Sequence, residues 1–248
     1  MKKFIAMTLA LVMMLAMFAG CSAKEEATTA ATEATTAAPE ADIHAKGEGV
    51  MTYEEYAAAE LDSEVVIEAF VQAKQSWWED KATVYLQDKD GAYFVYEMAC
   101  SEEDYAKLEV GTAIKVTGYK AEWSGEVEIV DAVFEILEGS FVAEPFDATA
   151  LLGTEELINY QNQKVSFKGL TVESVEYKNE EPGDDIYVTL SNGEESFNFC
   201  VEVYLTGVDT DVYTTVGTLN AGDKVDVEAF LYWYEGANPH ITKITVVE

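Results

Sequence analysis

The 248-residue sequence contains no arginine, and its 15 lysines stand against 47 aspartates and glutamates, which gives a net charge of −32. Proteins hold phosphate groups with arginine, lysine and helix N-termini, and affinity for nucleic acid depends largely on neutralising its backbone. The composition therefore predicts that nucleic acid is not a partner. Anionic lipid headgroups should be repelled for the same reason.

Cysteine and histidine are also scarce, with three and two residues. Cys100 and Cys200 each lie near the end of an apolar stretch, so we expect both to be buried as small apolar side chains. A disulfide between them is the alternative. There is no CxxC pair and no cluster of cysteines with His44 or His240, so the sequence predicts no zinc site, and it indicates no cofactor.

Motifs of catalysis are missing as well: there is no glycine-rich phosphate loop, no Ser-His-Asp set and no nucleophile elbow. The turn at Asp88 to Gly91 and the acidic loop at residues 179–185 carry oxygen ligands suited to calcium, but the first favours Asp and Gly as a turn in any case. No carboxylate pair for glycoside hydrolysis stands out among so many acids. We therefore expect no enzymatic activity.

The N-terminus has the pattern of an export signal: two lysines, an apolar run over residues 4–18, and then Ala19-Gly20-Cys21. The run is shorter than the roughly 20 apolar residues of a membrane span, although an uncleaved anchor is the alternative. Ala19-Gly20-Cys21 resembles the cleavage box of bacterial lipoproteins, except that Phe18 replaces a usual aliphatic residue. The resemblance implies a signal peptide over residues 1–20, a lipid on Cys21, and anchoring at the extracytoplasmic face of the bacterial cell membrane.

The segment at residues 21–49 consists mostly of alanine, threonine and glutamate. It carries too little apolar surface to offset the entropy of ordering, so it is predicted to be a disordered tether. A random coil of this length has a root-mean-square reach of about 30 Å. That reach would hold a folded part clear of a bilayer surface.

The remaining chain repeats one pattern. Residues 85–97, YLQDKDGAYFVYE, resemble residues 187–202, YVTLSNGEESFNFCVE, and the turns Asp90-Gly91 and Asn192-Gly193 interrupt alternating apolar runs in both. Each copy is typical of a β-hairpin. Similar glycine and apolar positions before and after the hairpins recur with a slowly drifting spacing, which predicts two duplicated domains at residues 50–140 and 146–248.

Each repeat is predicted to contain a strand, a two-stranded hairpin, a connection and two more strands. In the first connection, Ser101-Glu-Glu-Asp104 is typical of a helix N-terminus. Five strands with a helix in that place resemble the OB fold, a small Greek-key barrel. We therefore expect an all-β protein with short helices, built as two tandem OB-like barrels. Residues 53–56, 88–94 and 118–125 are also similar to OB-like domains of bacterial surface lipoproteins.

Strand alternation separates the expected core from the expected surface. Positions 84, 86, 94, 96 and 98 are apolar or aromatic in both repeats, where they correspond to positions 186, 188, 197, 199 and 201. These side chains should face the barrel interiors, and Tyr85 and Tyr93 should face outward.

Aromatic residues gather where OB barrels bind ligands, across the second and third strands and the neighbouring loops. The predicted ligand-binding residues are Trp77, Trp78, Tyr85, Tyr93 and Trp123. Stacking on these rings suits a neutral glycan. The alternative is that the rings cap the barrel end or pack one domain against the other. The second repeat carries a similar cluster at residues 232–234.

The sequence thus favours a lipid-anchored binding or adaptor module without catalytic activity, whose partners are the membrane, through Cys21, and a glycan or an envelope protein. One alternative is a hydrolase that acts on polysaccharide through surface carboxylates. Another is a structural spacer in an envelope complex.

We predict that Cys21→Ser moves the protein from the membrane fraction to the soluble fraction, because the lipid on this cysteine is the attachment that the sequence indicates. Fractionation of cells with detergent-free washing measures the effect, and Cys100→Ala serves as the control that stays with the membrane. A Cys21→Ser variant that still pellets would contradict the lipoprotein interpretation.

Overall fold

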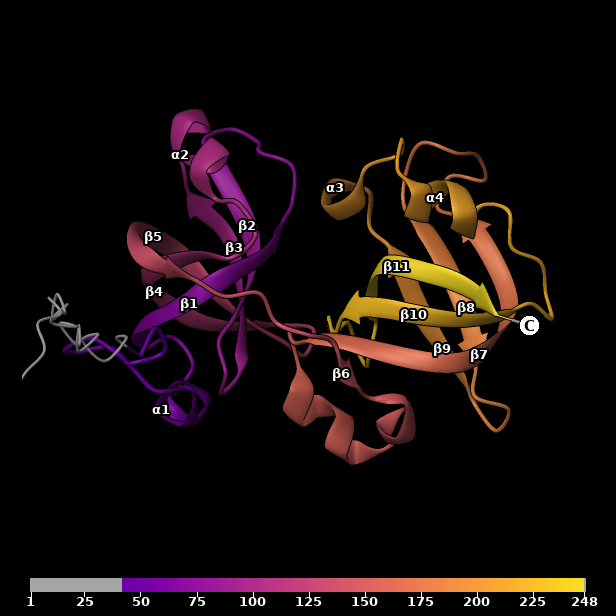
Figure 1. The fold of residues 1–248 in the computed structure, drawn as a ribbon, viewed down its shortest axis with the longest axis horizontal. Helices are drawn as coiled ribbons and strands as arrows, with labels where there is room; N and C mark the ends of the chain where they lie inside the picture. The colour runs from indigo at the N-terminus through magenta and orange to yellow at the C-terminus, as the bar shows by residue number, and fades with distance from the viewer. Residues whose placement is uncertain (1–41, 248) are drawn as a thin grey trace, which may run out of the picture. The chain divides into compact units, whose positions relative to one another are not determined.

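The computed structural model describes residues 42–247, and their first part is a closed five-stranded barrel (Figure 1). Its strands are β1 (Glu64–Lys74), β2 (Lys81–Gln87), β3 (Ala92–Ala99), β4 (Thr112–Trp123) and β5 (Glu126–Ser140), with α1 (Tyr53–Ala58) before β1 and α2 (Glu102–Lys107) between β3 and β4. The order around the barrel is β1-β2-β3-β5-β4. Strands β3 and β5 are parallel, and the other neighbours are antiparallel.

The second part repeats this ring. Its elements are β6 (Phe146–Asp147), the 3₁₀ helices η1 (Thr149–Leu151) and η2 (Glu155–Tyr160), β7 (Lys164–Tyr177), β8 (Ile186–Ser191), β9 (Ser196–Val201), α3 (Val203–Thr206), α4 (Asp211–Val216), β10 (Lys224–Phe230) and β11 (His240–Val247). The sheet order is β10-β11-β9-β8-β7-β6, and pairing of β10 with β7 closes five of these strands into a ring. The predicted class, two tandem OB-like barrels with short helices, is confirmed. The domain bounds at residues 50–140 and 146–248 stay a prediction.

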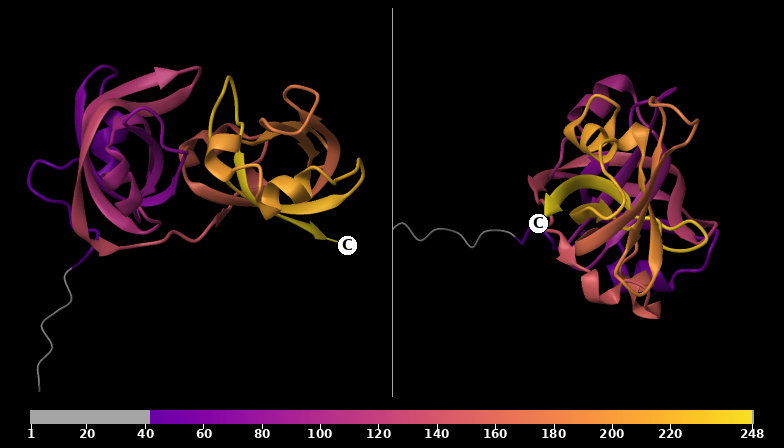
Figure 2. Two further views of the ribbon diagram at one scale, coloured as in Figure 1. Left: turned by 90° about the horizontal axis from the view of Figure 1, so that it is seen from above. Right: turned by 90° about the vertical axis from the view of Figure 1, so that its right-hand side faces the viewer.

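Long, bent first strands close both rings (Figure 2). The first half of β1 pairs with β4 and its second half pairs with β2. Strand β7 divides its pairing between β10 and β8 in the same way. Each of these strands thus forms hydrogen bonds with two neighbouring strands, one along each half of its length. This pairing closes the five-stranded sheet into a barrel without a free edge.

Local side-chain chemistry forms the predicted turn and helix. The Asp88 carboxylate accepts hydrogen bonds from the backbone N–H groups of Asp90 and Gly91, at 2.8 and 2.9 Å, and so holds the first hairpin turn. A Cβ atom on Gly91 would lie 2.3 Å from the ring of Tyr53, so only glycine fits there. The Ser101 hydroxyl accepts a hydrogen bond from the backbone N–H of Asp104 at 3.1 Å and so caps the N-terminus of α2, as the sequence predicts.

Each barrel has its own apolar core, and the predicted alternation is right for β2, β8 and β9. It is wrong for β3. Two residues of β3, Tyr96 and Glu97, lie opposite the single residue Thr83, and Glu97 has a φ of 48°. This β-bulge shifts the alternation by one residue. As a result Tyr93 points into the core, while Phe94 and Tyr96 point out of the barrel.

The bulge therefore corrects the assignment of Tyr93 as a ligand-binding residue. Its side chain is fully buried and packs edge-on against Tyr56 of α1 and Tyr53, with ring centroids 4.9 and 5.6 Å apart. Its hydroxyl has no hydrogen-bond partner within residues 42–247.

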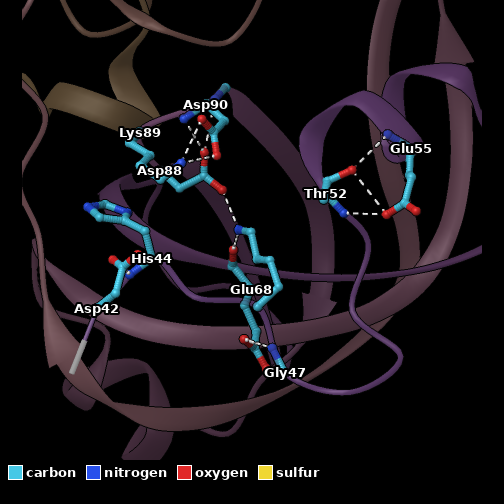
Figure 3. Close-up of polar contacts among 11 residues, drawn as sticks. Asp42, His44, Gly47, Thr52, Glu55, Glu68, Asp88, Lys89 and Asp90 are labelled. Atoms are coloured by element: carbon cyan, nitrogen blue, oxygen red, sulfur yellow. Dashed lines mark hydrogen bonds and ion pairs between the residues drawn. The ribbon is translucent and has the colours of Figure 1, made fainter. Parts of the chain in front are cut away.

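The end of the predicted tether lies against the first barrel (Figure 3). Lys46 forms an ion pair with Asp88 and donates to the Glu68 carbonyl at 2.6 Å, and the His44 ring packs on Phe70 and Phe141. Residues 42–49 are thus fixed by a few specific contacts, which corrects this part of the tether prediction. The signal peptide, Cys21 and the rest of the tether lie outside the described residues.

Cys100 and Cys200 are both free and buried, as the sequence predicts. Burial raises the pKa of the Cys100 thiol to about 11. Within residues 42–247 no helix has the length and hydropathy needed to cross a membrane.

We predict that Tyr93→Ala lowers the free energy of unfolding by about 3–5 kcal/mol, since it empties a packed core position. Tyr93→Phe should be neutral or slightly stabilising, because it removes a buried hydroxyl that has no partner. Chemical denaturation measures both variants. A Tyr93→Ala variant as stable as the wild type would contradict the core position.

Candidate functional site

Two adjoining cavities lie on the outer side of β2 and β3. We call the first the Trp78 cavity; its volume is about 320 Å³, and its walls include Gln75, Trp77, Trp78, Lys81, Tyr96, Glu97 and Tyr204. We call the second the Glu128 cavity; its volume is about 410 Å³, and it is lined by Gln75, Phe94, Tyr96, Trp123, Glu128, Glu202, Tyr232 and His240. Since Gln75 and Tyr96 line both cavities, the two form one continuous surface, which we call the aromatic face.

Trp78 stands on a tight turn at the start of β2. Its backbone pairs with that of Lys81 at 3.0 and 3.3 Å, and both intervening residues, Glu79 and Asp80, have positive φ. The turn leaves the Trp78 side chain 70% exposed. By contrast, the half-buried Trp77 donates its indole N–H to the Cys100 carbonyl at 2.9 Å, so this ring mainly anchors the turn.

The bulge in β3 brings Tyr96 to the aromatic face. Glu97 donates its backbone N–H to the Thr83 hydroxyl at 3.1 Å, and its carboxylate forms an ion pair with Lys81 at 2.6 Å. These contacts fix the bulge, and Tyr96 consequently forms the wall between the two cavities. Strand alternation alone placed this ring in the core.

The second barrel supplies the opposite wall. Tyr204 of α3 is 62% exposed, and its backbone carbonyl accepts from the Ser76 N–H at 2.7 Å. Tyr232 stacks on His240 with centroids 4.3 Å apart and meets Phe94 edge-on at 5.5 Å. The sequence did not assign these residues, although the cluster at residues 232–234 was a signal for Tyr232.

Trp123 ends β4 and is 54% exposed, as expected of a ligand-binding residue. Its ring lies 5.3 Å from that of Tyr234, in the connection between β10 and β11. Trp78 and Trp123 are thus the two predicted residues that the structure places, exposed, on the aromatic face.

Tyr85 points out of its barrel, as predicted, but it is fully buried between the two barrels, which form one compact unit. It stacks on Phe230 with centroids 4.4 Å apart, and its hydroxyl makes a 3.1 Å hydrogen bond with Nδ1 of His240. The assignment of Tyr85 to ligand binding is therefore wrong. Its ring packs one barrel against the other, which was the alternative that the sequence left open.

Polar contacts continue this junction. The buried carboxylate of Glu126 accepts from the Trp233 backbone N–H at 2.8 Å, and Gln161 donates to the Gly125 carbonyl at 2.8 Å. Gln87 accepts from the backbone N–H of Lys164 at 2.9 Å. These bonds join residues far apart in the chain, so the aromatic face is built on a fixed junction.

Burial shifts the ionisation of the groups around the Glu128 cavity. It raises the pKa of Glu126 to about 8 and that of Glu202 to about 7, and it also raises the pKa of Glu128. It lowers the pKa of His240 to about 3, so this imidazole is neutral at physiological pH. In each case desolvation disfavours the charged form.

No group of three or more His, Cys, Asp and Glu side chains in the described part of the chain is arranged to hold a metal ion. What the arrangement offers instead is flat rings for stacking and carboxylates for accepting hydrogen bonds.

No protein-family model and no curated protein sequence matches the chain. Among solved structures, a murine DNA-binding protein bound to double-stranded DNA is 13% identical, with a TM-score of 0.35, over 74% of this chain and 95% of that one. A replication protein A heterotrimer bound to single-stranded DNA is 13% identical, with a TM-score of 0.32, over 80% and 52%.

Asparaginyl-tRNA synthetase from Pyrococcus horikoshii is 19% identical, with a TM-score of 0.29. The match covers 35% of this chain and 19% of the synthetase, so the chain spans about a fifth of that protein.

These matches correct the expectation that nucleic acid is not a partner. Two of the similar structures contain DNA, and each match covers most of this chain. The exclusion rested on the net charge of the whole chain, whereas a ligand contacts only a local part of the surface, whose charge can differ. The exclusion of nucleic acid is therefore withdrawn.

We predict that Glu126→Gln weakens the pH dependence of stability. The folded-state pKa of about 8 lies above the usual value of 4.5, so ionisation as the pH rises through this range destabilises the folded state. The free energy of unfolding should fall between about pH 5 and pH 9 in the wild type, and Glu126→Gln should remove on the order of a few kcal/mol of that fall. Denaturation curves across this range measure it.

Glu122→Gln, an exposed position near the end of β4, is the matched control and should keep the wild-type slope. An unchanged slope in Glu126→Gln would show that this carboxyl is ionised without cost.

Proposed function

We propose that the chain is a non-catalytic binding module, lipid-anchored through Cys21 at the extracytoplasmic face of a bacterial membrane, and that the aromatic face binds a glycan. The observation that carries this proposal is the pair of exposed tryptophans, Trp78 and Trp123, beside adjoining cavities. The lipoprotein-like N-terminus supports the location.

The position of the aromatic face supports ligand binding. OB barrels bind oligosaccharides and oligonucleotides across the second and third strands and the loops after the first and fourth. Here Trp78 comes from the β1–β2 loop, Tyr96 from β3, and Trp123 from the end of β4. A single extended ligand across Tyr96 would contact both tryptophans.

The chemistry of the face suits a sugar. The apolar side of a pyranose ring stacks on an exposed indole, and its hydroxyl groups need hydrogen-bond acceptors and donors. The Trp78 cavity supplies the Glu97 carboxylate, the Lys81 ammonium group and the Gln75 amide around the rings. Because the Lys81–Glu97 ion pair and the bulge already fix these groups, little side-chain entropy is lost on binding.

We predict that Trp78→Ala and Trp123→Ala each weaken glycan binding several-fold, since a stacked ring contributes on the order of 1 kcal/mol. A glycan array identifies a ligand, and isothermal titration calorimetry measures its affinity for each variant. The melting temperature should change by only a few degrees.

Tyr119→Ala removes an exposed tyrosine of the same barrel that lines neither cavity, and it should bind as the wild type does. If no glycan binds, or if an oligonucleotide or an envelope protein binds in a manner that depends on Trp78, the glycan proposal fails. Release of reducing sugar from a bound glycan would instead favour the hydrolase.

A further inference from the structure

The Glu128 cavity differs in chemistry from the Trp78 cavity beside it. Four aromatic rings and two carboxylates line it, and no lysine does. Its one imidazole, that of His240, is uncharged because it is buried and stacked against Tyr232. The cavity therefore presents carboxyl groups and aromatic ring faces, and no cationic side chain of the described residues lines it.

Glu128 is the carboxylate in the cavity lining that has no partner in the described part of the chain. It is only 9% exposed, it lines the cavity, and within residues 42–247 its carboxylate makes no hydrogen bond and no ion pair. The nearest lysine in the face, Lys81, lies in the neighbouring cavity and is already paired with Glu97. No group of the described residues competes for this mostly buried carboxylate, so an ion or donor that enters the cavity can pair with it without displacing an existing bond.

Glu202 provides a second, fixed acceptor. One of its carboxylate oxygens accepts from the Gln75 amide at 3.1 Å, and the other accepts from the Tyr204 backbone N–H at 3.0 Å. These two bonds come from different barrels and hold the carboxylate at the cavity wall. A ligand group between Glu128 and Glu202 would meet acceptors that are already oriented.

The aromatic rings are also held in place. Tyr232 is fixed between His240 and Phe94, and the Trp123 ring rests near Tyr234. Cations bind over the faces of such rings within about 6 Å of the centroid. Aromatic rings combined with carboxylates suit an organic cation whose charge is spread over several atoms. A metal ion would instead need a cluster of oxygen ligands, and residues 42–247 contain no such cluster.

We propose that the Glu128 cavity binds the ammonium group of a small organic cation, with Glu128 as the charge partner and Trp123, Tyr96 and Tyr232 as the surrounding rings. The volume of about 410 Å³ admits a quaternary ammonium compound or an amino sugar. This site shares Tyr96 and Trp123 with the proposed glycan surface, but its charge partner is Glu128, and ammonium binding does not require that a glycan binds.

Binding should be coupled to proton release. The titratable groups that face Glu128 are Tyr96, Glu126, Glu202, Tyr232 and His240. Burial raises the pKa values of the glutamates and tyrosines among them, so the carboxyl groups are partly protonated near neutral pH. Burial lowers the pKa of His240, so the imidazole is neutral there and none of the described groups lining the cavity carries a positive charge. A bound cation favours ionised carboxylates. Affinity should therefore rise with pH through the Glu202 pKa of about 7.

Calorimetry of the purified protein with two matched pairs of probes tests the proposal. Choline is compared with its neutral isostere 3,3-dimethylbutan-1-ol, and glucosamine is compared with N-acetylglucosamine. At least one ammonium probe should bind about tenfold more tightly than its neutral partner. The affinity for choline, whose charge is permanent, should increase between about pH 6 and pH 8; for glucosamine, whose amine itself loses a proton in this range, the affinity is compared per protonated amine. Heats of choline binding measured in two buffers of different ionisation enthalpy should show proton release.

Glu128→Gln should reduce the affinity for the ammonium probe about tenfold and should reduce proton release, while Glu122→Gln should leave both unchanged. Trp78→Ala removes a ring of the proposed glycan surface that does not line the Glu128 cavity, so it should leave ammonium binding unchanged, and failure of one proposal is distinguishable from failure of the other. The proposal is overturned if neither ammonium probe binds in the millimolar range, if the neutral partner binds equally well, or if Glu128→Gln binds as the wild type does.

Discussion

The burial of Tyr85 between the barrels is the contact on which the aromatic face depends. Its ring stacks on Phe230 and its hydroxyl bonds to His240, which in turn supports Tyr232. Strand β2 of one barrel is thereby connected to a wall that the other barrel supplies. A single barrel would present Trp78 and Trp123 but would lack Tyr204 and Tyr232, so the duplicated chain makes a surface that one copy cannot make.

The same junction gathers carboxyl groups that are mostly buried. Glu126, Glu128 and Glu202 lie close to its rim, in a chain without arginine. Both oxygens of Glu202 accept hydrogen bonds, from the Gln75 amide and the Tyr204 backbone N–H, whereas Glu126 accepts one from the Trp233 backbone N–H and its other oxygen has no partner within residues 42–247. Acidic proteins usually keep such groups in water. Here their burial gives the face an electrostatic character that net charge does not describe.

Features that depend on neighbouring residues were predictable from the sequence. The hairpin turns, the Ser101 helix cap and the two five-stranded rings follow from turn chemistry and strand alternation, and Trp78 and Trp123 were placed by their loops. Tyr85 was not, since its partner His240 lies 155 residues away and nothing local encodes that contact. Tyr93 and Tyr96 exchanged roles because alternation cannot reveal a bulge. Residues 42–49 have the composition of a tether, yet a few contacts from His44 and Lys46 hold them.

The bulge at Glu97 shows how two copies of one barrel can diverge. The equivalent hairpin of the second barrel pairs without interruption from Ile186 to Ser191, and Phe199 remains in its core. In the first barrel a single extra residue rotates Tyr96 to the outside, while Tyr93 and Met98 still fill the interior. A one-residue insertion can thus add a surface ring without removing an apolar residue from the core. Gaining or losing one backbone position, rather than exchanging side chains, is then a route by which tandem barrels acquire distinct surfaces while their cores stay apolar.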